Sequence, residues 1–338
     1  MARIAFVGTG AQGAGIAADL TRAGLDVTFI EQWPAHVEAM RASGIEVRLP
    51  EETQVTQVHA LHLCEVATLR EPFDIVFVLV KAYDTRWAVE LIKPLVADDG
   101  LVVGLQNGMT IDDIASVVGP ERTIGAVIEM ASNMFEPGVV TRQNAPADSW
   151  FAVGAYDDAA RGRAEEVQAV LRHAGTVEVV DDIRSAKWMK LVANAGELVP
   201  SAILDAPLAE AVRIPGVHEF MVECGKEAAR AAIADGSTLV PIFGLTHDQV
   251  TGPDQYAEDL LGEVLDRFSR PDTLTTVLQD WMKGRRAEVE DVNGLVVRVL
   301  EAQGEKAPHN AHTVELALRI ERGELTRSRD NLDLLLGL

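Results

Sequence analysis

A glycine-rich turn near the start of the chain restricts the fold more than any other feature. Residues 8–13 read Gly-Thr-Gly-Ala-Gln-Gly, directly after the apolar run Arg3–Val7 and before a stretch of helical periodicity. The first glycine permits a tight turn, the second lets the backbone approach a pyrophosphate, and the third lets the helix pack closely on the strand. The helix dipole and free N–H groups then face the anion. The predicted cofactor contacts in this turn are Gly8, Gly10, Ala11, Gln12 and Gly13.

An acidic residue after the second predicted strand bears on the choice of dinucleotide. Glu31 follows Val27–Ile30, about twenty residues beyond the glycines, where a carboxylate binds the ribose hydroxyls and repels a 2′-phosphate. This favours NAD over NADP. An alternative stays open, in which Glu31 only caps the following turn and Arg41 reaches the phosphate of NADP.

The rest of the first half alternates β-branched runs with helical patterns, which predicts a parallel sheet covered by helices. The expected strands are Arg3–Val7, Val27–Ile30, Ile75–Val80, Leu101–Leu105 and Thr123–Ile128, with Gly138–Arg142, Trp150–Val153 and Thr176–Val180 closing the sheet. The expected helices are Ala11–Ala23, Ala35–Ser43, Thr85–Leu95, Ile111–Val118 and Ala159–His173.

The pattern of apolar residues changes at Asp181–Asp182, after which they recur at spacings of three and four residues. The expected helices there are Leu208–Val212, Val217–Ala234, Gln255–Phe268, Thr275–Lys283, Ala287–Ala302 and Ala311–Arg322, with a loop around Pro241–Pro253. The sequence therefore predicts a Rossmann-type α/β domain over residues 1–181 and an all-helical domain over residues 182–338.

Composition narrows the kinds of partner. The 338 residues carry a formal net charge of −22, which repels nucleic acid and anionic membranes, so we expect neither as a partner. An anionic small molecule must then be held by local basic groups or helix N-termini.

The two cysteines, Cys64 and Cys224, show no metal-ligand spacing and the eight histidines form no HExxH pattern, so no metal is expected. The longest dense apolar run, Ile75–Val80, is far too short to span a bilayer, and we expect a cytoplasmic protein.

Five segments in order resemble the ketopantoate reductase (2-dehydropantoate 2-reductase) family. They are the glycine turn, Val80-Lys81-Ala82, Gln106-Asn107-Gly108-Met109, Lys187-Trp188-Met189-Lys190-Leu191-Val192-Ala193-Asn194, and Leu278-Gln279-Asp280 with Glu288 and Asn293-Gly294. The resemblance implies a Rossmann domain followed by a helical domain of the 6-phosphogluconate dehydrogenase type, a homodimer, and a step of pantothenate biosynthesis.

The resemblance also implies roles for particular residues. Lys190 would be the general acid and Glu288 a carboxylate that binds substrate. Asn107 and Lys81 would lie beside the nicotinamide and the substrate carbonyl, and Asn194 would bind substrate.

The residues themselves support part of this assignment. Lys190 and Asn194 are four apart and share a helical face, and an ammonium group there can stabilise the alkoxide formed by hydride addition and deliver its proton. Lys187 lies one turn earlier and is expected to be solvated surface, the usual state of a lysine. Lys81 and Asn107 follow predicted strands, at the edge where open sheets bind ligands. His309 and His312 are expected to be capping or surface residues.

One departure from the family pattern concerns the substrate. The helix of the family carries a second asparagine eight residues after the lysine, where this chain has Leu198, and Pro200 stands one residue late. Glu197 occupies the face of Asn194 instead, where it would repel an acidic substrate or pair with Lys190 or Lys187.

Three functions remain open on the sequence alone. The first is reduction of a 2-oxo acid, with ketopantoate as the leading candidate. The second is an NAD-dependent dehydrogenase of another hydroxy acid or sugar acid in catabolism. The third is a nucleotide-sensing Rossmann protein without catalytic activity.

Overall fold

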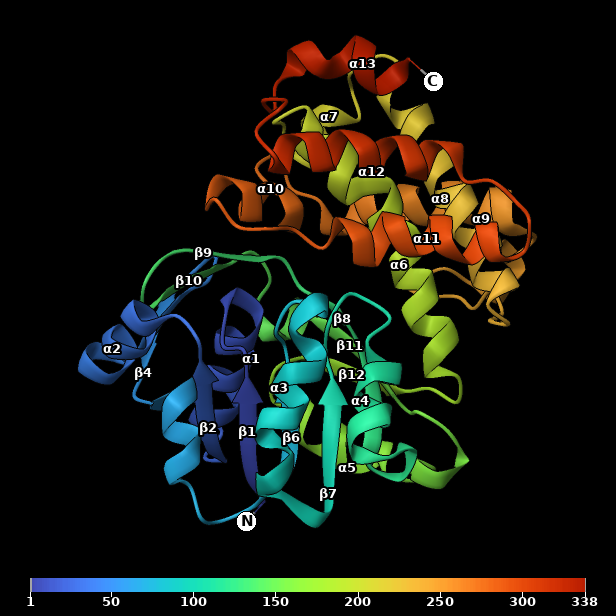
Figure 1. Cartoon of the computed structure of the whole chain (residues 1–338). Helices are drawn as coiled ribbons and strands as arrows, with labels where there is room; N and C mark the ends of the chain where they lie inside the picture. Colours follow the sequence, from blue (N-terminus) through green and yellow to red (C-terminus); the bar gives the residue numbers. More distant parts are fainter. Residues whose placement is uncertain (1, 338) are drawn as a thin grey trace. The chain divides into compact units, whose positions relative to one another are not determined.

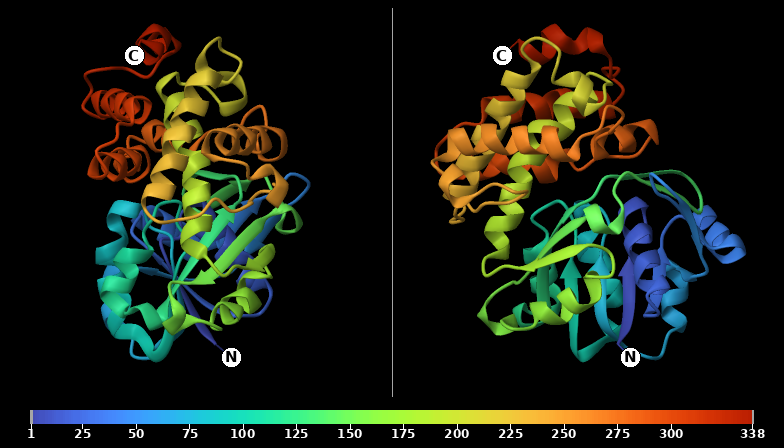
Figure 2. Two further views of the ribbon diagram at one scale, coloured as in Figure 1. Left: turned by 90° about the vertical axis from the view of Figure 1, so that its right-hand side faces the viewer. Right: turned by 180° about the vertical axis from the view of Figure 1, so that it is seen from behind.

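The computed structural model describes residues 2–337. The chain divides into two compact units, Met1–Ile183 and Arg184–Leu338. Figure 1 shows the first unit as a sheet with helices on both faces and the second as an assembly of helices, and Figure 2 shows the same from two other sides.

The first unit is built on an eight-stranded sheet in the order β12-β11-β8-β7-β6-β1-β2-β5. Its strands are β1 (Arg3–Val7), β2 (Asp26–Glu31), β5 (His59–His62), β6 (Phe73–Val78), β7 (Val96–Gly104), β8 (Thr123–Glu129), β11 (Trp150–Ala155) and β12 (Thr176–Val179). All neighbouring pairs are parallel except β11 and β8, which are antiparallel. The order places the carboxyl end of β1 between those of β2 and β6.

Alternate residues of the central strand enter two different cores, as the pleat of a strand requires. Ile4 and Phe6 pack in a cluster with residues of α1 (Ala11–Arg22), α2 (Pro34–Ser43) and α5 (Ala164–Leu171). Ala5 and Val7 pack in a second cluster with residues of α3 (Thr85–Ile92) and α4 (Ile111–Val118). The sheet is therefore buried on both faces, which explains the nearly continuous apolar sequence of its strands.

A second sheet of four strands was not predicted. It has the order β4-β3-β10-β9 and comprises β3 (Ile45–Arg48), β4 (Thr53–Thr56), β9 (Ser132–Glu136) and β10 (Val139–Arg142). The prediction that residues 138–142 close the main sheet is wrong, because β10 pairs with β3 and β9. The buried guanidinium of Arg142 forms an ion pair with the carboxylate of Asp19 on α1, which ties the small sheet to the glycine-turn helix.

The second unit is helical. It contains α6 (Ile183–Ile203), α7 (Leu208–Ala211), α8 (Val217–Ala234), α9 (Pro253–Glu263), α10 (Thr276–Met282), α11 (Val289–Ala302), α12 (Pro308–Glu321) and α13 (Leu332–Leu336). Every residue from 185 to 204, which includes most of α6, is buried. No helix within residues 2–337 is long and apolar enough to cross a membrane.

The fold-class prediction is confirmed: a Rossmann-type sheet comes first and helices follow. Most helix bounds agree with the expected ones to within a turn. Two differ by more. In place of Ala159–His173, α5 begins only at Ala164, after a short 3-10 turn over Asp158–Ala160. In place of Gln255–Phe268, α9 ends at Glu263 and continues as a π-helix over Val264–Phe268.

Candidate active site

The glycine turn has the geometry of a pyrophosphate cradle. Gly8 has φ +93°, and a Cβ added there would lie 2.7 Å from the backbone nitrogen of Val80. A Cβ on Gly13 would lie 2.3 Å from the carbonyl oxygen of Gly8, so the start of α1 packs directly on the turn. A Cβ on Gly10 would meet no atom of residues 2–337 within 4 Å. The turn is therefore tightly packed on its inner side and open at Gly10, which fits a dinucleotide lying at the N-terminus of α1.

A buried histidine that the sequence analysis missed holds this turn in place. The backbone N–H of Gly138 donates to Nδ1 of His36 at 2.8 Å. Nδ1 is therefore an acceptor, the proton is on Nε2, and Nε2 donates to the carbonyl oxygen of Thr9 at 3.0 Å. His36 lies in α2 outside any motif, so its sequence position carried no signal for this role.

Glu31 caps the turn after β2 with one carboxylate oxygen and faces the glycine turn with the other. Its Oε1 accepts hydrogen bonds from the N–H groups of Gln32 and Trp33, each at 2.9 Å, so it does cap the turn after β2. Its Oε2 lies 3.3 Å from the hydroxyl of Thr9, beside the glycine turn. Arg41 instead donates to the carbonyl oxygen of Ala60 at 2.9 Å and to the carboxylates of Glu38 and Glu65.

The first unit brings Lys81 and Asn107 to the same edge of the sheet. They follow β6 and β7, which are neighbouring parallel strands. The side chain of Gln106 joins the two segments, because its Nε2 donates to the carbonyl oxygen of Val80 at 2.7 Å and to the hydroxyl of Thr85 at 2.8 Å. The segments that carry Lys81 and Asn107 are thus joined by a buried amide.

The second unit concentrates polar side chains on a helix that is otherwise core. Lys187, Lys190, Asn194 and Glu197 are 1%, 8%, 1% and 5% exposed and lie on successive turns of α6. Charged residues are almost never fully buried without a reason in pairing or function. This cluster in the helical core is therefore the strongest indication of a site in the second unit.

The prediction that Lys187 is solvated surface is wrong, because this residue is only 1% exposed. Burial lowers its pKa to about 7, and the negative charge of Glu288 opposes this shift. Its ammonium and amine forms thus coexist near neutral pH, which makes Lys187 a second candidate proton donor beside Lys190.

Glu288 lies at the N-terminus of α11, where it occupies the N-cap position. It is only 9% exposed although charged residues flank it in the sequence, and its charge acts on Lys187. The amide of Asn194 is also notable, since its Nδ2 donates no hydrogen bond to any atom of residues 2–337. A buried donor of this kind is costly unless a ligand accepts from it.

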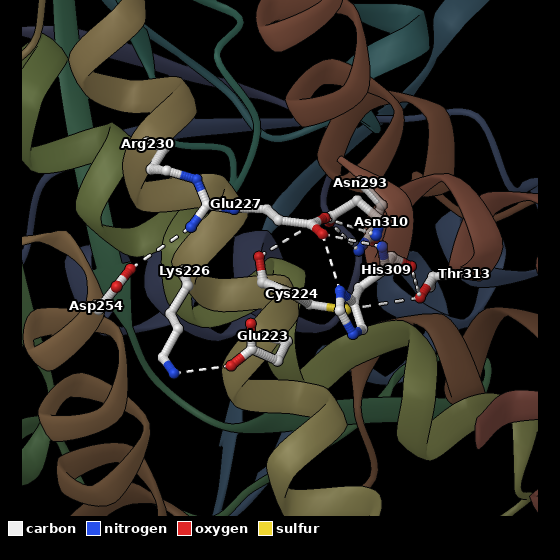
Figure 3. Close-up of polar contacts among 10 residues, drawn as sticks. All are labelled: Glu223, Cys224, Lys226, Glu227, Arg230, Asp254, Asn293, His309, Asn310 and Thr313. Atoms are coloured by element: carbon white, nitrogen blue, oxygen red, sulfur yellow. Dashed lines mark hydrogen bonds and ion pairs between the residues drawn. The ribbon is translucent and has the colours of Figure 1, made fainter. Parts of the chain in front are cut away.

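Figure 3 shows a polar network that links α8, α11 and α12. The Glu227 carboxylate of α8, 1% exposed, accepts from the N–H groups of His309 and Asn310, each at 2.9 Å. Asn310 Oδ1 accepts from Asn293 Nδ2 at 2.9 Å, and the same Nδ2 donates to the carbonyl oxygen of Ala195 at 2.9 Å. Asn293 therefore joins α11 to both α6 and α12.

The two histidines near the start of α12 are structural. His309 Nδ1 lies 2.9 Å from Oε1 of Glu227, and His312 Nε2 lies 2.8 Å from the carbonyl oxygen of Leu334. Within the described part of the chain, no group of three His, Cys, Asp or Glu side chains is arranged to hold a metal ion.

Models of one protein family match both units. The model described as ketopantoate reductase PanE/ApbA matches residues 4–157, and the model of its C-terminal part matches residues 182–321. Together they cover most of the chain.

Individual relatives agree with the family models. The 2-dehydropantoate 2-reductase of Archaeoglobus fulgidus is 29% identical over 325 residues, which is 95% of this chain and 98% of that protein. The crystal structure of a PanE/ApbA family ketopantoate reductase from Ralstonia eutropha is 28% identical, with a TM-score of 0.78 over 95% of this chain and 99% of that one. A D-mandelate dehydrogenase solved with NADH and anilino(oxo)acetate shares the fold, with a TM-score of 0.84 at 20% identity and coverage of 95% and 99%. The chain belongs to the ketopantoate reductase family.

Proposed function

We propose that this protein reduces the 2-oxo acid 2-dehydropantoate (ketopantoate) to pantoate with a nicotinamide dinucleotide. Membership of the family makes it an NAD(P)-dependent oxidoreductase that acts on a CH–OH group. The observation that carries the assignment is the end-to-end match to 2-dehydropantoate 2-reductases, together with buried lysines on α6.

The chemistry requires one hydride and one proton. When bound at the glycine turn, the reduced cofactor supplies the hydride for C2 of the oxo acid. The ammonium of Lys190 donates the proton to the carbonyl oxygen, and the ketone becomes a secondary alcohol. A positioned ammonium stabilises the negative charge that develops on this oxygen in the transition state.

The remaining predicted residues bind and orient. Asn194 Nδ2 donates to an oxygen of the substrate, and Glu288 accepts from a hydroxyl group. Lys81 and Asn107, joined through Gln106, line the nicotinamide end of the cofactor site. Glu197 contributes a carboxylate to the substrate side of α6.

The test of this function is a set of initial rates with ketopantoate and either NADH or NADPH. Lys190→Ala should lower kcat by roughly 10²- to 10⁴-fold, the usual effect of losing a general acid. Lys226→Ala is the matched control, because this lysine pairs with Glu223 on α8, away from the α6 cluster. Turnover by Lys190→Ala at the parental rate would remove Lys190 from the mechanism.

For the cofactor we propose NAD. The proposal is supported by the carboxylate of Glu31 beside the glycine turn and by the engagement of Arg41 with Glu38 and Glu65. Glu31→Ala should narrow the gap between the KM values for NADH and NADPH, because it removes the charge that repels a 2′-phosphate. If the unmutated protein already prefers NADPH, the proposal of NAD fails.

A second candidate rests on Glu197. A buried carboxylate on the substrate side of α6 favours a substrate with additional hydroxyl groups, as in oxidation of a hydroxy acid or sugar acid by NAD. Turnover of such acids with NAD, with no reduction of ketopantoate, would select this activity.

We further propose that the protein is a homodimer in the cytoplasm. Free Cys64 and Cys224 fit a reducing compartment. Light scattering on the purified protein tests the dimer by its mass.

A further inference from the structure

The loop between α8 and α9 contains a turn with an unusual residue at its centre. The N–H of Leu245 donates to the carbonyl oxygen of Ile242 at 3.0 Å and closes a four-residue turn. Both central residues have positive φ, +59° at Phe243 and +96° at Gly244. Two positive values mark a type I′ turn, whose first central position strongly favours asparagine, aspartate or glycine. A phenylalanine there is an outlier, and such outliers gather at functional sites.

The turn is held by its surroundings. The hydroxyl of Tyr256, a buried residue of α9, donates to the carbonyl oxygen of Val240 at 2.7 Å. On the other side, a Cβ on Gly244 would lie 2.3 Å from Nη1 of Arg267. Arg267 is itself fixed by an ion pair with Glu263 at 2.6 Å. The turn is thus contacted by α9 on one side and by Arg267 on the other.

The side chain of Phe243 has a specific neighbour. Its ring is 5% exposed, and Nζ of Lys190 lies 4.8 Å from the ring centroid. This is the geometry of a cation–π contact, which strengthens when the pair is shielded from water. Lys190 is 8% exposed, so the pair meets that condition.

We propose that Phe243 is a positioning residue, which holds the ammonium of Lys190 for proton donation. The inference rests on the proposed role of Lys190. A lysine has a flexible four-carbon stem, and a general acid works only when its proton is aimed at the acceptor. An aromatic face attracts the ammonium without offering an oxygen to which the proton could move. The left-handed backbone is the means by which the loop turns this ring toward α6.

The test compares variants at position 243 by steady-state kinetics with ketopantoate and the preferred cofactor. Phe243→Leu keeps an apolar side chain but removes the ring, and should lower kcat by roughly 5- to 30-fold, the scale of a shielded cation–π contact. The KM for the cofactor should stay unchanged. Phe243→Tyr and Phe243→Trp retain a ring and should restore most of the rate. Phenylalanine analogues with one, two and three fluorine atoms should lower kcat stepwise, since fluorine weakens the negative potential of the ring face.

The matched control is Phe220→Leu. Phe220 is also 5% exposed and lies in α8, where its ring contacts His309. Its loss should lower the melting temperature and leave kcat nearly unchanged. Equal losses of kcat in Phe243→Leu and Phe243→Tyr, or no change along the fluorine series, would overturn the proposal.

Lys190→Ala is measured in parallel, to distinguish a failure of the proposed role of Lys190 from a failure of the positioning role of Phe243. If Lys190→Ala retains activity, the proposed role of Lys190 has failed. If Lys190→Ala is inactive while Phe243→Leu works at the parental rate, only the positioning role of Phe243 has failed.

Discussion

Lys187 shows how burial changes the chemistry of a single residue. In water its amine would be protonated far above neutral pH, but in the core of the second unit its pKa falls to about 7 because burial disfavours the charged form. The sequence could not reveal this. A lysine three residues before another on a helix is ordinarily solvent-facing, and only the burial of α6 on all sides makes it a core residue.

The consequence for stability follows from proton linkage. Between pH 7 and the unfolded-state value of 10.5, the unfolded chain binds more protons at Lys187 than the folded chain. The free energy of unfolding of the unmutated protein should therefore rise relative to Lys187→Met as pH increases through this window, by up to about 1.4 kcal/mol per pH unit. Below pH 7 the difference should be constant.

Urea unfolding of both proteins from pH 6 to pH 10 measures this effect. Parallel stability curves across the whole range would mean that Lys187 stays protonated in the folded protein. It would then be an ordinary paired ammonium, and Lys187 would no longer be a candidate for a second proton donor.

At the scale of elements, α6 depends on close packing with α8. Gly196 lies at the crossing, where a Cβ would come within 2.9 Å of the carbonyl oxygen of Met221. The contact is with backbone, which cannot move aside as a flexible side chain can. Glycine is therefore required at the middle of a helix, where it otherwise costs about 0.5–1 kcal/mol relative to alanine.

This packing predicts opposite outcomes for two glycine-to-alanine changes. Gly196→Ala should lower the free energy of unfolding by roughly 1–3 kcal/mol, the range for overpacking a tight core. Gly262→Ala in α9, where no described atom lies within 4 Å of an added Cβ, should raise it by about 0.5–1 kcal/mol. Chemical unfolding of both variants tests the prediction, and equal effects of the same sign would contradict it.

The elements missed from the sequence share a physical character. β4 reads Thr-Gln-Val-Thr and has only one buried residue, and β3 and β5 are equally short. Strands of four residues with exposed polar side chains give no clear period, and their pairing depends on segments far away in the chain. The long buried strands of the main sheet, β1, β2 and β6 to β8, had a strong local signal and were predicted.

At the scale of the whole molecule, the sequence predicted the type and order of the secondary-structure elements better than it predicted the residues of the site. The alternation of strands and helices followed by helices alone predicted the fold class. The glycine turn, Glu31 and the segments of the family predicted candidate site residues. His36, Gln106 and Phe243 were not predicted, because each acts through a contact with residues distant in sequence. The net charge of −22 gives an anionic substrate no long-range attraction, which is why the proposed mechanism assigns attraction at short range to the buried lysines of α6.

The anchoring of α12 by Glu227 has a consequence for amide exchange with deuterium. The first N–H groups of a helix have no partner within it and ordinarily exchange quickly. Here those of His309 and Asn310 both donate to a buried carboxylate that belongs to another helix. Their exchange should be slow and should occur only when α8 and α12 separate. The two N–H groups donate to different oxygens of Glu227. Glu227→Gln leaves only one of these oxygens able to accept, so deuterium should enter one of the two positions much faster while the central amides of α12 change less. Early labelling of both positions in the unmutated protein would show instead that α12 opens at this end while the remainder of the unit stays folded.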